Sequence, residues 1–261
     1  MAKNNNLTEL DGFHYLVKGR HGHFVANRND IYVGGALITY GEFSELETEF
    51  FREQVDKNTT VIEIGANIGA HTVWMAKNAK RVIAVEPQPF LFYTLCAQVV
   101  LNSLQNVHCV MAGVSDKRGI MMVPRMDYSK ENNYGGIELH TPIPNVPADE
   151  VPLITLDSLY EQYNIEGRVF LKIDVEGMEL EVLKGGTKSI MDNRPVMYIE
   201  NDRQEKSAAL MNYIKELKYV TNRHQPALFN PNNFFKKKDN KWGRNIVSMN
   251  EICIPFPTNP V

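Results

Sequence analysis

The stretch VIEIGANIGAHT, residues 61–72, decides how this sequence is read. Its first four residues are rich in β-branched side chains, which favour a strand, and Gly65 and Gly69 then allow a tight turn. An apolar run from Thr72 to Lys80 is compatible with a helix. A strand, a glycine turn and a helix in this order is how α/β proteins bring backbone N–H groups close to a nucleotide-like ligand.

Two details of this turn narrow the choice of ligand. The glycines are spaced G-x-x-x-G, whereas the dinucleotide fingerprint is G-x-G-x-x-G; Asn67 and Ala70 stand at its second and third glycine positions. Glu63 lies inside the strand, where its carboxylate could bind a cationic amino group. S-adenosylmethionine (SAM) carries such an ammonium group and NAD does not, so the turn favours SAM.

The composition is that of an ordinary soluble globular protein. The 261 residues are 43% hydrophobic and 23% charged, which suits one large domain. A formal net charge of -3 gives no overall attraction to nucleic acid, so we do not expect a nucleic-acid partner. Three widely separated cysteines without a CxxC motif indicate neither a disulfide framework nor a zinc site. No apolar run approaches the ~20 residues of a membrane span, and we expect a cytoplasmic location.

The remaining sequence alternates strand and helix patterns. This alternation predicts an α/β fold: a Rossmann-like, doubly wound, mostly parallel sheet with helices on both faces and an antiparallel C-terminal strand. At the first helix, Ser44 is a good N-cap and Glu47 could close a capping box. The expected strands cover residues 81–86, 107–112, 170–174, 196–200 and 246–255, with 219–221 as the last hairpin partner. The expected helices cover residues 45–55, 90–104, 177–190, which Gly185-Gly186 could cut short, and 204–218.

Two parts of the chain fall outside this alternation. We expect residues 1–41 to form an N-terminal β extension, a meander with strands near residues 13–17, 23–26 and 30–33, ahead of a main domain at 42–261. The second part is a β-rich insertion at about residues 115–152, part hairpin and part loop. Variable loops on a fixed sheet carry recognition, so we expect substrate specificity to reside in this insertion.

Acidic residues stand at the ends of the predicted strands. Glu86 follows Gly65 by 21 residues, and a carboxylate there can hold a ribose diol through two charge-assisted hydrogen bonds. Gly113 and Val114, after the third strand, would line a base pocket. Asp174 ends the fourth strand and should point into the cleft, because ligands of open α/β sheets bind at the carboxyl ends of strands.

Several roles stay open for the acids of the fourth and fifth strands. One of them could be a general base that takes a proton from an attacking hydroxyl, with His71 as a further base candidate. Asp174 could instead form an ion pair with Lys172. Alternatively Asp174, Glu200 and Asn201 offer oxygen ligands for Mg²⁺. We rank a function in the cleft first, the ion pair second and the metal third, and we predict no metal site.

Taken together, these motifs resemble the FkbM-type methyltransferases, a group of Rossmann-like SAM-dependent methyltransferases. The resemblance implies SAM as methyl donor and O-methylation of a hydroxyl, often on a sugar or polyketide-like molecule, so the expected partner is a small-molecule or glycan acceptor. The matching segments are VIEIGANIG (61–69), VIAVEPQP (82–89), VSD (114–116), ITLDSL (154–159) and LKIDVEGME (171–179).

The resemblance also implies roles for individual residues. Asp174 would lie beside the methyl group and Glu176 near the acceptor, and these two form the expected catalytic group together with His71. Glu63 stands where many relatives have Asp. The methionine end of SAM would be held by Glu63, Gly65, Asn67 and Gly69, and its ribose by Glu86. The expected cofactor-binding set is completed by Glu42, Ala66, Pro87, Gln88, Gly113, Val114 and Asp174.

Three other functions are weighed as alternatives. A catalytically inert SAM-binding module would keep the binding motifs, but the intact Asp174 and Glu176 argue against it. An NAD-dependent oxidoreductase is disfavoured by the missing G-x-G-x-x-G fingerprint. A nucleic-acid methyltransferase would be expected to carry an Asn/Asp-Pro-Pro-aromatic signature at the fourth strand, where this sequence has DVEG, residues 174–177.

Overall fold

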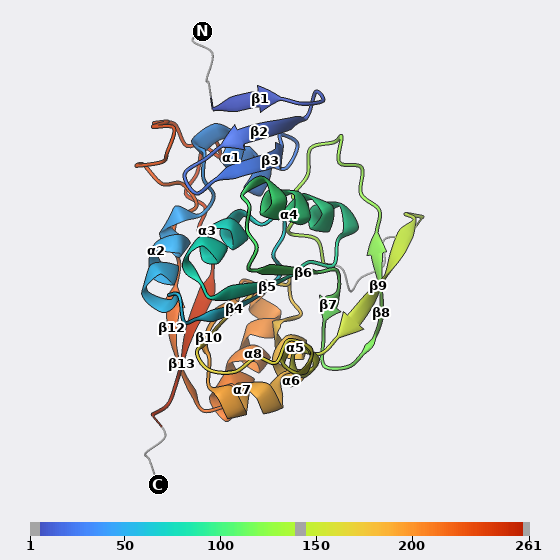
Figure 1. The fold of residues 1–261 in the computed structure, drawn as a ribbon, viewed down its shortest axis with the longest axis vertical. Coiled ribbons are helices and arrows are strands. Elements are labelled where there is room, and N and C mark those ends of the chain that lie inside the picture. Colours follow the sequence, from blue (N-terminus) through green and yellow to red (C-terminus); the bar gives the residue numbers. More distant parts are fainter. Residues whose placement is uncertain (1–5, 139–144, 258–261) are drawn as a thin grey trace.

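The computed structural model describes residues 6–138 and 145–257. Its centre is a seven-stranded sheet in the order β12-β13-β11-β10-β4-β5-β6 (Figure 1). β13 is antiparallel to both of its neighbours, and the other pairings are parallel. This confirms the predicted Rossmann-like sheet and its antiparallel C-terminal hairpin. The strands are β4 (Thr60–Ile64), β5 (Arg81–Val85), β6 (Val107–Val110), β10 (Val169–Ile173), β11 (Val196–Glu200), β12 (Tyr219–His224) and β13 (Asn250–Pro255).

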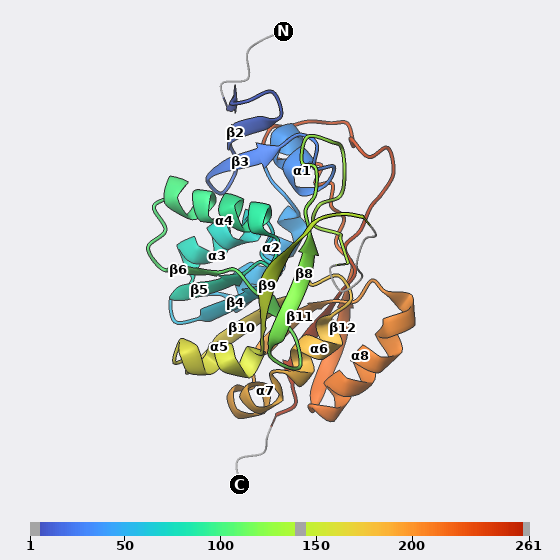
Figure 2. The same ribbon diagram turned by 90° about the vertical axis from the view of Figure 1, so that its right-hand side faces the viewer.

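Helices cover both faces of this sheet (Figure 2). The two central strands, β4 and β10, are buried along their whole length, which is why their sequences are nearly continuous apolar runs. One face is covered by α2 (Glu45–Gln54), α3 (Ala70–Asn78) and α4 (Pro89–Leu101). The other face is covered by α5 (Leu156–Gln162), α6 (Glu179–Lys184), α7 (Thr187–Asn193) and α8 (Gln204–Glu216).

Two helix boundaries on the second face have a clear origin in the sequence. Gly185 and Gly186 separate α6 from α7, as predicted. α5 was not predicted, although Thr155 begins it with a capping box: the Thr155 hydroxyl accepts the Ser158 N–H, and the Ser158 hydroxyl reaches back to Thr155.

The N-terminal region contains a helix as well as strands. β1 (Leu7–Glu9), β2 (His14–Lys18) and β3 (His23–Asn27) form the expected antiparallel sheet. The strand predicted at residues 30–33 is wrong, because α1 (Val33–Tyr40) begins there. The Asp30 carboxylate accepts the N–H groups of Tyr32 (3.1 Å) and Gly34 (2.8 Å), which favours a helix start.

The capping box predicted for α2 is also wrong. Ser44 adopts a left-handed conformation with φ 44°, and it makes no side-chain cap hydrogen bond. The Glu47 side chain turns into the protein, where the Asn250 side-chain amide donates a 2.9 Å hydrogen bond to its carboxylate. Glu47 therefore belongs to the interior and not to the helix end.

The insertion forms a small separate sheet. β7 (Gly113–Val114), β8 (Gly119–Pro124) and β9 (Ala148–Ile154) pair in the order β7-β9-β8, and β8 and β9 form the predicted antiparallel hairpin. The loop between them includes residues 139–144, which lie outside the described residues. The third strand of the main sheet ends at Val110, earlier than predicted, because the next residues lead toward this second sheet.

A long segment between β12 and β13, residues 225–249, leaves the central sheet and lies beside α1 (Figures 1 and 2). We call it the strap. Tyr40 holds it through three hydrogen bonds: the Tyr40 carbonyl accepts from Phe235 N–H, and its hydroxyl bonds Asp239 O and Lys241 N–H. Residues 246–249, expected in the last strand, belong to the strap. Across residues 6–138 and 145–257, no helix has the length and apolar character needed to cross a membrane.

Candidate active site

Two adjoining cavities open at the carboxyl ends of the parallel strands, where open α/β sheets bind ligands. The smaller cavity encloses about 490 Å³ and the larger about 1230 Å³, counting space open to solvent. Both lie in or above the size range of small-molecule sites. Because they share lining residues, they form one continuous cleft. The shared residues are Gly65, Glu86, Gly135, Asp174 and Glu176.

The glycine turn forms the floor of this cleft. Gly65 has φ +82°, and a Cβ atom on it would lie 1.7 Å from the Asp174 carbonyl oxygen, so only glycine fits between β4 and β10. Gly69, at φ +84°, directly precedes α3. Asn67 also has a positive φ of 53°, and its N–H donates to Glu86 Oε2 at 2.8 Å. The turn thus links the ends of β4, β5 and β10.

Glu86 lies at the tip of β5, between the two cavities. Its carboxylate accepts the N–H groups of Asn67 (2.8 Å) and Gln88 (2.9 Å), and burial raises its pKa to about 7. A carboxylate has about four lone-pair sites, so two remain after these bonds. Gln88 donates its side-chain amide to Tyr134 O, while its buried Oε1 has no hydrogen-bond partner among the described residues.

Apart from Glu86, Gln88, Asp174 and Glu176, the smaller cavity is lined by apolar residues and glycines. Gly113 and Val114 are both there, as the sequence predicted for a base pocket, and Pro87 joins them. The insertion contributes Met121 and Ile137. The smaller cavity is therefore suited to a largely apolar ligand group that also contacts the Glu86 carboxylate.

Lys172 is a buried cation at the centre of the cleft. It is 3% exposed, and its Nζ lies 2.9 Å from Asp174 Oδ2, so the ion pair considered from the sequence is present inside the cleft. Burial lowers the pKa of Lys172, but the carboxylates of Asp174, Glu63 and Glu47 outweigh burial and raise it. Lys172 thus stays charged and balances several carboxylates.

Glu63 is more enclosed than the sequence suggested. Its carboxylate accepts a 2.5 Å hydrogen bond from the Thr72 hydroxyl on α3. Burial raises its pKa to about 7, and Lys172 opposes that shift. Glu63 lines the larger cavity together with Ala66 and Asn67, so these predicted residues do come together.

A second group of acids, which we call the acidic edge, consists of Asp174, Glu176 and Glu200. One oxygen from each lies within 4.8 Å of the others, a spacing that could hold a metal ion. Arg203 already supplies a cation, with its Nη2 2.5 Å from Glu176 Oε2. Asn201, considered as a metal ligand from the sequence, instead donates to Glu251 at 3.2 Å.

Glu200 is the acid of this edge without a local partner. Its buried Oε2 has no hydrogen-bond partner among the described residues. Burial raises the pKa of Glu200 well above its usual range, and the neighbouring Asp174 and Glu176 add to this shift. The ionised form of Glu200 is therefore disfavoured relative to that of an exposed glutamate.

His71 and Glu47 both line the larger cavity. The His71 ring contacts the rings of Phe43 and Phe51 at centroid distances of 5.5 and 5.2 Å. Its Nε2 lies 3.6 Å from Glu47 Oε2. Burial lowers the pKa of His71 well below its usual value, with Lys172 adding to the shift, so the ring is neutral at pH 7.

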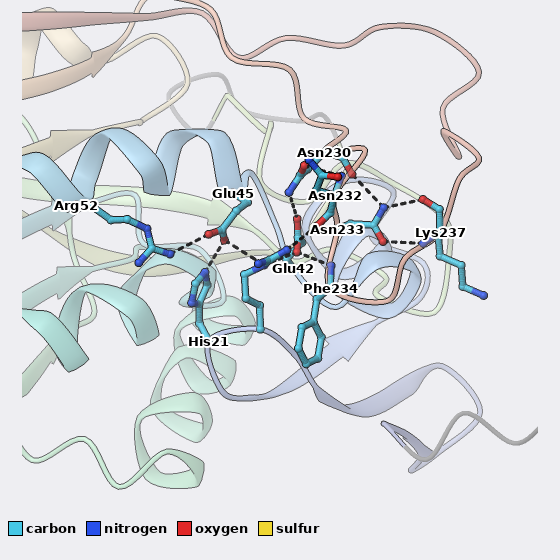
Figure 3. Close-up of polar contacts among 10 residues, drawn as sticks. His21, Glu42, Glu45, Arg52, Asn230, Asn232, Asn233, Phe234 and Lys237 are labelled. Carbon is cyan, nitrogen blue, oxygen red and sulfur yellow. Dashed lines mark hydrogen bonds and ion pairs between the residues drawn. The ribbon is translucent and has the colours of Figure 1, made fainter.

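The structure does not bring Glu42 to the cleft, although the sequence suggested a cofactor-binding role. Glu42 is absent from the lining of both cavities. Its carboxylate accepts hydrogen bonds from Asn230 Nδ2 (2.8 Å) and Phe234 N–H (2.7 Å) of the strap (Figure 3). Arg20 Nε donates to the same carboxylate at 2.6 Å. Glu42 therefore anchors the strap.

We expect Glu42→Gln to lower stability and to leave the affinity for SAM unchanged. An amide cannot balance Arg20, and the part-buried pair contributes on the order of 2 kcal/mol. At roughly 2–4 °C per kcal/mol, the melting temperature should fall by about 4–8 °C. Thermal unfolding and a SAM titration on the same sample measure both quantities. If the folded variant instead lost much of its SAM affinity, Glu42 would have to be assigned to cofactor binding after all.

Comparison with known protein families shows to which family this chain belongs. The model of the methyltransferase FkbM domain matches residues 63–221, which is more than half of the chain and includes the end of β4, all of β5 and β10, and the acidic edge. The chain belongs to this family. This is the family that the sequence resemblance implied.

Relatives of this FkbM methyltransferase match parts of it. The methyltransferase sdnD of Sordaria araneosa is 26% identical over 187 residues, 57% of this chain and 72% of the relative. A probable ribosomal RNA small subunit methyltransferase A of Methanosphaera stadtmanae is 41% identical over 56 residues, 22% of this chain. The crystal structure of methyltransferase FkbM from Methylobacillus flagellatus KT has a TM-score of 0.49 and 18% identity over 75% of this chain. The chain spans 21% of the archaeal protein and 44% of the crystallised one.

Proposed function

We propose that this FkbM methyltransferase transfers the methyl group of SAM to a hydroxyl oxygen of a sugar or another small-molecule or glycan acceptor. One observation carries the proposal: the smaller cavity, which suits an adenosine, and the larger polar cavity meet at Asp174 and Glu176. A cofactor in the first and an acceptor in the second would face each other at that junction. This is the arrangement that a direct transfer requires.

The residues present fit SAM along its whole length. Glu86 has free lone pairs for the ribose diol, and Gly113 and Val114 would contact the adenine. Asp174 at the junction and Glu63 in the larger cavity offer carboxylates that suit the ammonium group of the methionine end. Gly65 allows the backbone to approach the cofactor closely because it has no side chain.

When bound, SAM supplies an electrophilic methyl group, which the acceptor oxygen takes while the sulfur keeps the bonding electron pair. The chain orients the two reactants and receives the hydroxyl proton. In this proposal Asp174 lies beside the methyl group, Glu176 lies near the acceptor, and His71 faces the cavity as a proton acceptor.

The charges of the larger cavity support a hydroxyl acceptor without phosphate groups. Its described lining has two cations, Lys172 and Arg203, and both are already paired with carboxylates. A phosphate would find no unpaired cation there and would face the carboxylates of the acidic edge. The same charges argue against nucleic acid as the acceptor.

Calorimetric titration tests the cofactor half of this proposal. We expect one SAM to bind per chain and NADH to give no binding heat, because the glycine turn lacks the dinucleotide fingerprint. NADH binding in place of SAM would make an oxidoreductase the better account of the site.

A further inference from the structure

We propose that His71 and Glu47 act as one unit at the acceptor position: His71 takes the proton of the acceptor hydroxyl, and Glu47 stabilises the imidazolium that results. This inference rests on the proposed function and names the residues that carry its proton-transfer step. Glu47 would be a positioning residue that acts through His71.

The first observation is that one ring nitrogen of His71, Nε2, is buried without a hydrogen bond in the described part of the chain, while the Ser44 backbone is a hydrogen-bonding neighbour of the ring. His71 is 6% exposed. A buried polar atom left without a partner costs about 1–3 kcal/mol. Yet the ring lines the larger cavity directly and is fixed in orientation by Phe43 and Phe51. This cost is compensated if the ring bonds the acceptor during turnover.

The second observation is that the other candidate bases are already engaged. Asp174 is held by Lys172 at 2.9 Å and Glu176 by Arg203 at 2.5 Å. Each ion pair occupies a carboxylate oxygen that would have to receive the proton. Burial, with Asp174 adding to it, also raises the pKa of Glu176 to about 8, so much of Glu176 already carries a proton at pH 7. Glu63 accepts a hydrogen bond from Thr72 at 2.5 Å. His71 is neutral at pH 7, and its Nε2 has no hydrogen-bond partner within the described residues.

Glu47 is built into the protein so that one oxygen faces His71. Its Oε1 accepts the Asn250 amide at 2.9 Å, and its Oε2 lies 3.6 Å from His71 Nε2. Glu47 is 5% exposed, so water screens this pair only weakly. A carboxylate this close to the ring stabilises its charged form, because a nearby opposite charge favours protonation of the imidazole.

Charged and titratable groups from several elements surround the pair. The charge of Lys172 on β10 lowers the pKa of both Glu47 and His71. His21, from the loop between β2 and β3, also lowers the pKa of His71. The charge of Asp174 raises the pKa of Glu47. Tyr198 of β11 and Ser248 of the strap are hydrogen-bonding neighbours of Glu47. Lys172 opposes a second positive charge on His71, and Glu47 offsets that effect when the proton arrives.

The proton-transfer step then balances. The acceptor O–H bond breaks and its proton goes to a ring nitrogen of His71. The oxygen forms a bond to the methyl carbon, the sulfonium–methyl bond breaks, and its electron pair stays on sulfur. S-adenosylhomocysteine and the methyl ether leave, and the imidazolium releases its proton to water.

A double-mutant cycle tests whether the two residues act as a unit. We expect Glu47→Gln and His71→Asn each to lower kcat about 100-fold, in line with general-base catalysis. The double variant should be no slower than the worse single variant, because each change removes the same function. The affinity for SAM should stay within about 2-fold of the wild-type value, and Glu47→Asp should recover part of kcat.

Glu45→Gln is the matched control. Glu45 lies on the same helix, is similarly buried and also contacts a histidine, His21, but it lines neither cavity (Figure 3). Its kcat should be unchanged. Single variants with kcat within about 3-fold of the wild-type value, or a double variant whose loss is the product of the two single losses, would overturn the proposal.

Histidine NMR of the complex with S-adenosylhomocysteine tests the His71–Glu47 pair without an acceptor substrate. The His71 signals, assigned from their loss in His71→Asn, should report a neutral ring between pH 6 and 8. Glu47→Gln should shift them, whereas Glu45→Gln should shift the signals of His21. A His71 ring that titrates near its ordinary pKa, or that ignores Glu47→Gln, would contradict the pair even if methyl transfer to a hydroxyl is found. Absence of transfer by the wild-type protein would instead refute the proposed function, and the catalytic role of the pair with it.

Discussion

Replacing Glu86 with glutamine weakens SAM binding by about 100-fold. The loss follows from the position of Glu86 at the tip of β5, where its carboxylate would accept two hydrogen bonds from the ribose diol. Hydrogen bonds to a charged group contribute about 1.5–3 kcal/mol each, and a loss of about 3 kcal/mol corresponds to roughly 100-fold in Kd. Calorimetric titration of the wild-type and variant proteins measures this difference.

Asp116→Asn is the matched control for the Glu86 variant. Asp116 is an exposed acid just after β7, close in sequence to Val114, and it is not part of the lining of the smaller cavity. Its removal should change the SAM affinity by less than about 2-fold. Equal affinities for the Glu86 variant and the wild-type protein would mean that the ribose lies elsewhere.

Gly65→Ala should destabilise the protein severely. Alanine is strained at φ +82°, and its Cβ would lie 1.7 Å from the carbonyl oxygen of Asp174, which belongs to the backbone and cannot rotate away. Strain and overpacking together should cost at least about 3 kcal/mol. The melting temperature should then fall by roughly 6–12 °C, measured by thermal unfolding.

Gly167→Ala separates the two contributions. Gly167 has nearly the same φ, +81°, but a Cβ atom there would meet nothing within 4 Å. This variant should lose only about 1 kcal/mol, the cost of the backbone conformation alone. If the two alanine variants were equally stable, β4 and β10 would not approach each other as closely as described.

The sequence predicted the central sheet because its signals are local. β4, β5, β10 and β11 are short apolar runs bounded by polar or glycine residues, and a pattern of this kind does not depend on distant partners. For the same reason Gly65, Glu86 and Asp174 could be assigned to one cleft: each stands at the carboxyl end of a parallel strand, and topology brings these ends together.

The parts that the sequence did not predict depend on distant contacts. Glu42 and Glu47 stand within one short segment, and nothing local shows that Asn230 and Asn250 turn them into an anchor and a cavity wall. The strap has no periodic hydrophobic pattern. The sequence therefore did not predict that the strap lies beside the N-terminal helix α1. The sequence predicted a strand at the start of α1 because Ile31, Tyr32 and Val33 suit a strand as well as the beginning of a buried helix.

The central claim is that methyl transfer from SAM ends on a hydroxyl oxygen. The measurement that tests it most directly uses SAM carrying a ¹³C-labelled methyl group, with a panel of neutral sugars and polyols and their phosphorylated counterparts, read by NMR of the products. We expect the label in a methyl ether of a neutral acceptor, with S-adenosylhomocysteine formed in equal amount. A label found on nitrogen, carbon or sulfur, or no transfer by protein that binds SAM, would contradict it.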